Sequence, residues 1–415
     1  MKKRIVIVSE FFHPVENATG YLLTRIADGL AREFEVHVVT GRYRNGQGGQ
    51  TFPARDRRGS ITIRRCFSAS FDKNNLFLRG INLVTFTVSV MLDLFRSLRP
   101  TDEILVVTNP PSLPFGVGLV ARWKECRFHL LVHDVYPEVL IAAGVIRRRG
   151  IVARFLFRIT DLLYATAESI IVLGRDMHAL LRERLGSNAG RLVLIPHWAE
   201  SDRIRPRSRN AGTLRKSLGL QRKFVVQYHG NMGRTHGIEL LAGAAWDLRD
   251  RPDLHFLFVG EGAKRPWLER FLETHNPGNI TLLSYQGRDR QGEILNVCDI
   301  AVIAFVPGMA GISVPSRMYN ILAAGKPILG IADRESELGK LIDEERIGWV
   351  VDPSSAGSLA SLLVRLAGEK KRIMEMGKRA RRVAERFSEQ NTLDSYRALF
   401  RGTSETVHPG GKVKR

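Results

Sequence analysis

Cysteine is scarce in this chain, which contains only Cys66, Cys126 and Cys298, all far apart in the sequence. No C-x-x-C spacing occurs, so the sequence supports neither a disulfide framework nor a zinc site built on paired cysteines. A reducing compartment such as the cytoplasm fits this usage best.

Long apolar runs are also missing. The first residues, MKKRIVIVSEFFHP, place basic residues before a short apolar run that ends at Ser9. That run is too short for a signal peptide and suits a first buried strand. The most apolar later window, 81–95, is broken by polar residues and is too short to cross a bilayer. We therefore expect no transmembrane segment.

Acidic residues are outnumbered, because 63 Lys and Arg stand against 42 Asp and Glu, which gives a net charge of +21. This excess indicates an anionic partner: a nucleic acid, a phosphorylated substrate or an acidic membrane surface. Charge alone does not choose among these three. The chain has 415 residues, 44% of them apolar, which is enough for two hydrophobic cores and predicts two globular domains.

Short β-branched runs alternate with longer amphipathic stretches, as in parallel sheets covered by helices on both faces. In the first half, strands are expected at 4–8, 35–41, 61–65, 103–108, 127–133, 169–174 and 191–196, with a helix at 21–32. In the second half, strands are expected at 223–230, 255–260, 279–284, 299–305, 327–331 and 348–352. The predicted fold class is α/β, with two Rossmann-like doubly wound domains facing each other across a cleft.

A polar and basic stretch marks the expected boundary between the two halves. We assign residues 1–200 to an N-terminal domain, 201–222 to a linker and 223–401 to a C-terminal domain. Residues 402–415 lack apolar spacing and are expected to form a disordered tail. The basic helical region 356–401 closes the fold, and its last helix is a candidate to pack back on the N-terminal domain.

The segment 311–327, GISVPSRMYNILAAGKP, follows an apolar strand and contains an expected helix start at Pro315 and Ser316. The unpaired amides of such a start, with Arg317 beside them, suit a phosphate or diphosphate. Asn320, one turn further on, would face the same way and could hold a sugar hydroxyl. Any strand–loop–helix unit has these local features, so this segment alone does not distinguish a phosphate site from an ordinary connection. The neighbouring loops supply the further evidence.

A second glycine-rich loop, YHGNMGRTHG at 228–237, follows the first strand of the second half. Gly230 and Gly233 allow close approach of a ligand to the backbone, and Arg234 and His236 lie where a diphosphate would be neutralised. The pattern is not G-x-G-x-x-G, so it does not predict a dinucleotide site. A tight turn is the simpler interpretation of the same glycines.

Three further loops carry candidate residues. FVGEG, at 258–262, contains Gly260 and Glu261, and a plain turn is the simpler interpretation of Glu261. The long polar loop 9–20 ends at Gly20, which could admit a sugar or an acceptor phosphate. His133 ends an expected strand, where it could bond a substrate hydroxyl or leaving-group oxygen while Asp134 orients it, although a lone histidine is more often structural.

In this order, the loops resemble those of the glycosyltransferases of family four. The resemblance covers nearly the whole chain and is carried by the loop ending at Gly20, VHDVYPE at 132–138, IPHW at 195–198, GNMGRTHG, FVGEG, and VPSRMYNILAAGKP at 314–327. It is especially similar to the bacterial branch that acts in capsule, exopolysaccharide or O-antigen assembly, whose members carry V-P-S-K/R-x-Y before A-x-G-K/R-P.

This resemblance implies the GT-B fold and transfer of a hexosyl or N-acetylhexosaminyl group from a nucleotide diphosphate sugar, expected to be a UDP-sugar. It implies retention of anomeric configuration, no bound metal ion and no cofactor. Catalytic positions are implied at His133, Asp134 and Gly20. Donor-binding positions are implied at Gly230, Asn231, Gly233, Arg234, His236, Gly260, Glu261, Val314, Pro315, Ser316, Arg317 and Asn320.

Two departures from the family pattern bear on the donor. Many members have two glutamates with seven residues between them, whereas this chain has Ile312 and Asn320 at these positions, so the first carboxylate's contact with the donor sugar is missing. Asn320 can still bond ribose hydroxyls. Where the glycine loop often has Lys, this chain has His236, which shifts the expected neutralisation of phosphate to Arg234 and Arg317.

Several basic and apolar segments predict contact with an anionic membrane, namely 55–58, 64–65, 76–99 and 139–158. The simpler interpretation is that these helices cover the sheet and their arginines are solvated. The expected acceptor is a lipid-linked saccharide or polyprenyl diphosphate, used by a cytoplasmic enzyme at the inner face of the membrane. The alternatives are a nucleotide-sugar epimerase of similar fold and a nucleic-acid-binding protein, although the sequence has no recognisable nucleic-acid-reading module.

Overall fold

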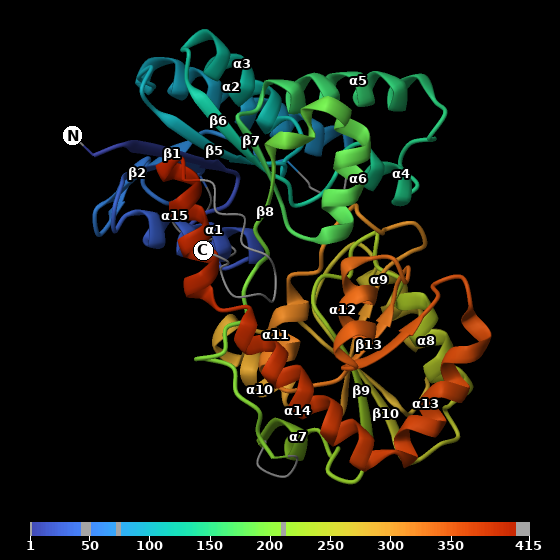
Figure 1. Cartoon of the computed structure of the whole chain (residues 1–415). Coiled ribbons are helices and arrows are strands. Elements are labelled where there is room, and N and C mark those ends of the chain that lie inside the picture. The colour runs from blue at the N-terminus through green and yellow to red at the C-terminus, as the bar shows by residue number, and fades with distance from the viewer. Residues whose placement is uncertain (1, 43–50, 72–75, 209–212, 404–415) are drawn as a thin grey trace. The chain divides into compact units, whose positions relative to one another are not determined.

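The computed structural model describes residues 2–42, 51–71, 76–208 and 213–403 (Figure 1). The chain forms two compact units. The first contains the residues up to Pro137, Arg148–Ile195 and the end of the chain from Gln390, and the second contains Glu138–Arg147 and Pro196–Glu389. The stretch 201–222, expected as a linker, belongs to the second unit. Of the expected tail, 404–415 lies outside the described residues.

An eight-stranded sheet forms the centre of the first unit, in the order β3-β4-β2-β1-β5-β6-β7-β8. All neighbouring strands are parallel except β3, which pairs antiparallel with β4. The central strands are buried at nearly every position, which matches their continuous apolar sequences. The strands are β1 (Arg4–Ser9), β2 (Glu35–Gly41), β3 (Arg55–Arg58), β4 (Ile61–Cys66), β5 (Glu103–Val107), β6 (Arg127–Leu131), β7 (Ser169–Val172) and β8 (Leu192–Leu194).

Helices cover both faces of this sheet. Figure 1 shows α2, α3 and α5 together on one side of the strands, and α1 and α15 on the other. The helices of the first unit are α1 (Ala18–Leu30), α2 (Leu76–Ser97), α3 (Leu113–Trp123), α5 (Ile151–Thr166), α6 (Arg175–Leu185) and the 3₁₀ helix η1 (Gly186–Arg191). Among the described residues, no helix is both long and apolar enough to span a membrane.

The last helix, α15 (Glu389–Arg401), packs in the first unit although it follows the whole of the second in sequence. Its Leu393 side chain fills the space above Gly29 of α1, where a Cβ would lie 2.8 Å away. The Lys3 ammonium donates to the Phe400 carbonyl at 2.6 Å, and the rings of Phe34 and Phe400 meet edge to face at 6.3 Å. The first unit therefore contains both the N-terminal residues and the C-terminal helix of the described chain.

A six-stranded parallel sheet forms the centre of the second unit, in the order β11-β10-β9-β12-β13-β14. Its buried strand residues join one hydrophobic cluster with side chains of the flanking helices. The strands are β9 (Phe224–His229), β10 (Leu254–Val259), β11 (Ile280–Leu283), β12 (Ile300–Ala304), β13 (Ile328–Ile331) and β14 (Gly348–Val351).

The helices of the second unit follow the expected alternation with strands. They are α4 (Glu138–Ala142), α7 (Thr213–Ser217), α8 (Ile238–Asp247), α9 (Arg265–His275), η2 (Arg288–Arg290), α10 (Gln291–Leu295), α11 (Arg317–Ala323), α12 (Glu337–Glu345), η3 (Ala356–Ser358), α13 (Leu359–Gly368) and α14 (Lys370–Arg386). The predicted α/β class, with two sheets of parallel strands and flanking helices, is confirmed.

Strand β3 was missed by the sequence analysis, which took residues 55–58 for a basic surface segment. The strand has no apolar residue, and it lies at the edge of the sheet, where only β4 pairs with it. Two of its four charged residues form ion pairs within the first unit, because Arg58 contacts Asp28 at 3.1 Å and Asp56 contacts Arg65 at 3.0 Å. Hydrophobic periodicity has no signal for such a strand.

Candidate active site

Three loops leave the same edge of the second sheet. Strand β9 lies between β10 and β12, and all three strands run parallel. The segments that follow them, 230–237, 260–264 and 305–316, therefore emerge side by side at the carboxyl ends of the strands, where ligands of such sheets bind. Most of the expected donor-binding residues lie on these three loops.

Backbone contacts hold the loop after β9 against the other two loops. The Met232 amide donates to the Glu261 carbonyl at 2.7 Å, and the Val306 amide donates to the Thr235 carbonyl at 2.9 Å. At Gly260, φ is +141°, and a Cβ would lie 2.1 Å from the Gly230 carbonyl oxygen. A side chain at position 260 would push two loops apart, so this glycine is required by the packing.

Arg317, the first residue of α11, crosses from one loop to the next. Its guanidinium carbon lies 4.7 Å from the centre of the Tyr228 ring, a cation–π contact, and its Nη1 donates to the His229 carbonyl at 3.4 Å. A Cβ on Gly230 would lie only 2.7 Å from Nη1. Nη2 is buried and has no hydrogen-bond partner among the described residues. A half-buried cation with a buried, unused donor is suited to an anionic oxygen.

His236 lies in the same cluster as a neutral ring. It stacks on Phe305, with ring centroids 5.5 Å apart, and its ring meets that of Tyr228 at right angles. Burial, reinforced by the positive charges of Arg317 and Lys264, holds the pKa of His236 well below its usual value. A neutral His236 can offer a hydrogen bond to a ligand, but it brings no positive charge to a diphosphate.

The outer part of the glycine loop carries the exposed residues Asn231 and Arg234. The hydroxyl of Tyr228, a residue of β9, donates to the Asn231 carbonyl at 2.6 Å and so restrains the loop backbone. Gly233 lies against His236, whose Nδ1 would be 3.1 Å from an added Cβ. Arg234 therefore stands at the rim of a rigid loop, within the same loop cluster as Arg317.

The loop between β12 and α11 ends in a buried pair, Val314 and Pro315, followed by the half-buried Ser316. Ser316 occupies the N-cap position of α11, but its side chain makes no capping hydrogen bond. The helix starts at Arg317, two residues later than the sequence predicts. The Ser316 hydroxyl is thus not used to cap its own helix.

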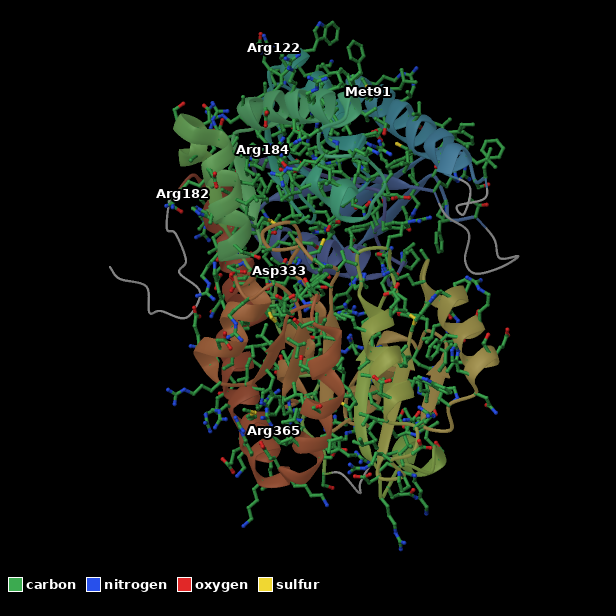
Figure 2. The ribbon with its side chains drawn as sticks, turned by 90° about the vertical axis from the view of Figure 1, so that its right-hand side faces the viewer. Met91, Arg122, Arg182, Arg184, Asp333 and Arg365 are labelled. Atoms are coloured by element: carbon green, nitrogen blue, oxygen red, sulfur yellow. The ribbon has the colours of Figure 1, made fainter. Side chains whose placement is uncertain are left out.

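Asp333, after β13, braces this loop. Its carboxylate accepts from the amides of Gly308 at 3.1 Å and Ala310 at 2.9 Å, and Figure 2 labels it in the second unit. Each bond has a charged acceptor and so is stronger than a neutral one. Asp333 is a positioning residue that the sequence analysis missed, since a carboxylate after a strand has no distinctive local pattern.

Asp333→Ala should therefore raise the KM for the donor by roughly threefold to tenfold, with a small effect on kcat, because the loop that carries Arg317 loses two restraints. Steady-state kinetics with varied donor would measure this change. Asp343→Ala is the matched control, since Asp343 is exposed and only pairs with Arg334 at 2.7 Å. An equal KM in both variants and the wild type would contradict the bracing role.

The Asn320 side chain forms hydrogen bonds with other residues of the second unit. Its Nδ2 donates to Glu200 Oε1 at 2.9 Å and to Gln291 Oε1 at 3.3 Å, and its Oδ1 accepts from the Glu200 amide at 3.1 Å. Both polar atoms of this amide are thus bonded to residues of the second unit, and the ribose contact of Asn320 stays a prediction. Glu200 also pairs with Arg288. The sequence analysis missed Glu200, whose available signal was its place just after the IPHW motif.

The Glu261 side chain stabilises the turn in which it lies. Its Oε1 accepts from Arg265 at 3.2 Å and from the Tyr285 amide at 3.3 Å, and its side chain is half exposed. These contacts agree with the simpler interpretation of the FVGEG segment as a turn. Glu261 therefore braces the loop after β10, and its carboxylate already has two hydrogen-bond donors.

In the first unit, Thr108 after β5 holds the loop that carries His133 and Asp134. Its Oγ1 accepts from the His133 amide at 3.1 Å and the Asp134 amide at 3.3 Å. From α6, Arg184 donates to the Tyr136 carbonyl at 2.9 Å. Figure 2 shows Arg184 among the inner side chains of the unit and Arg182, on the same helix, at its edge. The backbone after β6 is thus held from two elements.

Burial lowers the pKa of His133 to about 4, so its ring is neutral at pH 7. A neutral imidazole has one N–H donor and one acceptor nitrogen. At this position it can hydrogen-bond a sugar hydroxyl, but it does not act as an imidazolium acid. The structure keeps His133 and Asp134 at the carboxyl end of β6, where the sequence analysis expected them.

Gly20 lies in the first turn of α1 rather than at its start, and its contact with a ligand stays a prediction. Helix α1 begins at Ala18 rather than at Gly20, and the Asn17 side chain caps it by accepting from the Gly20 amide at 2.7 Å. A Cβ at Gly20 would lie 2.5 Å from the Val15 carbonyl oxygen. The lack of a side chain therefore lets the 9–20 loop fold back on its own helix.

The family models agree with this architecture. The model of the Glycosyl transferases group 1 matches residues 211–383, and that of the Glycosyl transferase 4-like domain matches residues 19–198. The first match contains the three loops around Arg317, and the second contains His133 and Asp134.

Similar proteins support the same family. The chain is 32% identical over 365 residues to WbjE of Pseudomonas aeruginosa, described as a probable glycosyltransferase, covering 87% of this chain and 88% of that one. It is 25% identical over 370 residues to WcaI of Escherichia coli K12, a glycosyltransferase assigned to colanic acid biosynthesis, covering 86% and 90%.

The fold is also that of Anabaena HepE, whose crystal structure contains UDP and glucose. The TM-score is 0.72 at 13% identity, and the alignment covers 96% of this chain and all of that one. Two family models match the chain, a relative is similar along most of its length, and the chain forms two α/β units. This chain is therefore a family-four glycosyltransferase with the GT-B fold.

Proposed function

We propose that the chain transfers a hexosyl or N-acetylhexosaminyl group from a UDP-sugar to a lipid-linked saccharide or polyprenyl diphosphate during assembly of a bacterial surface polysaccharide. The observation that carries the donor assignment is Arg317 at the carboxyl edge of the second sheet, a half-buried residue whose buried Nη2 has no hydrogen-bond partner among the described residues. Gly230 lets this guanidinium lie directly against the loop backbone, since a Cβ there would be 2.7 Å from Nη1.

The reaction breaks the bond between the anomeric carbon and the diphosphate oxygen, and the electron pair leaves with UDP. An acceptor hydroxyl forms the new bond on the same face of the sugar and releases its proton. Arg317 and Arg234 would take up the charge that develops on the departing diphosphate, together with loop amides. This supports a reaction that needs no bound metal ion, and the family resemblance supports retention.

His133 would act on the sugar rather than on the diphosphate. Its neutral ring, held by the loop bonded to Thr108, suits a hydrogen bond to a sugar hydroxyl. Asp134 shares the same restraint from Thr108. We assign both residues to positioning the donor sugar, and we assign no general acid step to His133.

The choice of UDP and of a surface polysaccharide is supported by similar proteins. HepE, of the same fold, binds UDP, and WcaI is assigned to colanic acid biosynthesis. To use a lipid-linked acceptor, the enzyme would have to act at the inner face of the cytoplasmic membrane. We therefore propose that it associates peripherally with that face.

A screen of nucleotides and nucleotide sugars by thermal unfolding would test the donor. At 100 times its Kd, a ligand of the folded state adds about 2.7 kcal/mol, which for a 415-residue chain unfolding as one unit corresponds to a rise in Tm of roughly 3 °C. UDP and one UDP-sugar should raise the Tm, and GDP, ADP and dTDP should not. No shift with any nucleotide would overturn the assignment.

Transfer itself would be measured with the radiolabelled UDP-sugar and a polyprenyl-diphosphate-linked saccharide. Label should move to the lipid fraction, and NMR of the product should show the anomeric configuration of the donor. Conversion of the donor sugar without an acceptor would instead indicate an epimerase of similar fold.

A further inference from the structure

Three helices of the first unit leave large apolar side chains exposed. Trp123 at the end of α3 is 66% exposed, and Ile151 and Leu162 of α5 are 77% and 67% exposed. Soluble proteins rarely expose many such side chains together without a partner. The exposed apolar residues of this surface, here called the outer apolar face, are Phe67, Phe71, Val84, Val88, Leu92, Phe95, Leu119, Trp123, Ile151, Val152, Phe155 and Leu162.

The residues of this face follow helical spacing. On α2 they are Val84, Val88, Leu92 and Phe95, spaced by four, four and three residues, which places them on one side of the helix. The opposite side of α2 is already in the core, where Phe86, Val90 and Leu94 are buried. Helix α2 thus has two apolar sides, and only one of them is used by the fold of the first unit.

The three helices are neighbours on the same side of the sheet. Helix α3 contacts both α2 and α5, and Figure 1 shows the three together on one side of the sheet. The rings of Phe95 and Trp123 stack with centroids 4.2 Å apart, which joins α2 to α3. Lys124 lies over Phe95 at 4.8 Å, so its charge is at the edge of the same surface. Phe67 extends the face, since its amide donates to Ser89 of α2.

Unpaired arginines lie among these apolar residues. Arg96, Arg122, Arg154 and Arg158 are exposed on the same helices, and none forms an ion pair with a described residue. Figure 2 shows Arg122 at the outer edge of the first unit.

The carboxylates of these helices are neutralised. Asp93 pairs with Arg64 at 3.0 Å, and Asp161 pairs with Arg184 at 2.7 Å. The outer apolar face therefore has a net positive charge.

We propose that the outer apolar face docks on an anionic lipid bilayer, with its apolar side chains at the acyl boundary and its arginines at lipid phosphates. Apolar stripes interleaved with unpaired arginines have the chemistry of interfacial helices. A second copy of this chain fits the face less well. A two-fold dimer would bring the same unpaired arginines of both copies together, and like charges repel.

This surface extends the proposed function, since it would bring the enzyme to a lipid-linked acceptor. The other basic segments of the first unit are less suited to the role. Arg58, Arg64 and Arg65 are paired with Asp28, Asp93 and Asp56 respectively. Residues 138–147 belong to the second unit and form no part of the face.

Vesicle flotation with the full chain would test the proposal, with phosphatidylethanolamine vesicles containing roughly 30% phosphatidylglycerol compared with phosphatidylcholine vesicles. Binding should require the anionic lipid and weaken at high salt. Leu119→Ser, Trp123→Ser and Leu162→Ser combined should lower the partition coefficient at least tenfold. Arg122→Gln, Arg154→Gln and Arg158→Gln combined should lower it about a hundredfold, at about fivefold for each charge.

The matched control combines Met374→Ser and Arg365→Gln, which remove an exposed apolar residue and an exposed arginine from the second unit. Its vesicle binding should equal that of the wild type. Unchanged binding in both face variants, or equal binding to neutral vesicles, would overturn the proposal. A wild-type dimer that becomes a monomer in the apolar variant, without vesicle binding, would assign the face to self-association instead.

The result is separable from the donor assignment. UDP-induced thermal stabilisation is measured without lipid and should be the same in both face variants and the wild type. Vesicle binding without any effect of nucleotides would uphold the face and refute the proposed transfer. Nucleotide binding without vesicle binding would uphold the donor assignment and refute the docking of the outer apolar face on lipid.

Discussion

Arg317→Ala is expected to lower kcat/KM for the donor by about 10²–10³-fold, while the Tm changes little. In the folded protein the guanidinium rests on Tyr228 and keeps Nη2 unused, so few internal contacts are lost on its removal. In the reaction, the same group would meet negative charge that grows as the diphosphate leaves. Loss of one such donor typically costs about 10²–10³ in rate.

Arg317→Lys should recover only part of this loss, because an ammonium keeps the charge but lacks the planar fork of donors. Arg234→Ala should have a smaller effect, about threefold to tenfold, since Arg234 is exposed and screened by water. UDP titration calorimetry and steady-state kinetics would measure these effects.

Arg365→Ala is the control for Arg317→Ala, because Arg365 is an exposed residue of the same unit that is labelled in Figure 2. It should behave as the wild type in both measurements. Unchanged UDP affinity in Arg317→Ala and Arg234→Ala would remove the diphosphate from this cluster of loops. A large fall in Tm for Arg317→Ala would instead indicate a structural role.

His133→Ala is expected to lower kcat by about 10²-fold, with UDP affinity nearly unchanged. The reason is its proposed contact with the sugar, which would strengthen as the anomeric carbon gains positive character. His133→Gln, which keeps a donor and an acceptor, should restore part of the rate. Single-turnover kinetics and UDP titration would separate the two effects.

The pH profile provides a further test of this role. Because burial lowers the pKa of His133 to about 4, the ring remains neutral as the pH falls from about 8 to 5. The part of kcat that depends on His133 should be constant over that range and be lost only as the pH approaches 4. A loss centred near pH 6.5 would show a ring with an ordinary pKa.

His129→Gln is the matched control, since His129 lies on β6, the strand that precedes His133, and is buried inside the first unit. Its ring nitrogens contact Ser169 at 2.7 Å and Glu103 at 3.3 Å, and its ring meets Phe400. This variant should lower the Tm and leave kcat of the folded enzyme unchanged. An equal loss of kcat at both positions would indicate that His133 acts through stability alone.

The strand runs were predictable because their apolar residues are consecutive, as in RIVIV of β1 and EILVV of β5. The loops of the candidate site were predictable for a related reason. In parallel sheets, segments after strands share one edge, so Gly230, Gly260 and Arg317 were expected to meet. The structure brings these three residues together.

Other residues depended on contacts between distant segments. Asn320 was expected to face a ribose, but its amide is bonded to Glu200, 120 residues earlier in the chain. The sequence analysis expected no strand at residues 55–58, which form the edge strand β3. Composition does not distinguish these possibilities.

By itself, the sequence determined the class of the fold, the order of its strands along the chain, and which loops carry glycine and arginine for an anionic ligand. These properties arise from local periodicity and local turn chemistry, which act over a few residues. The tertiary structure alone decided which arginines are paired and which apolar helix faces stay exposed. Burial and ion pairing depend on neighbours from remote segments, such as Asp28 beside Arg58 and Trp123 beside Phe95.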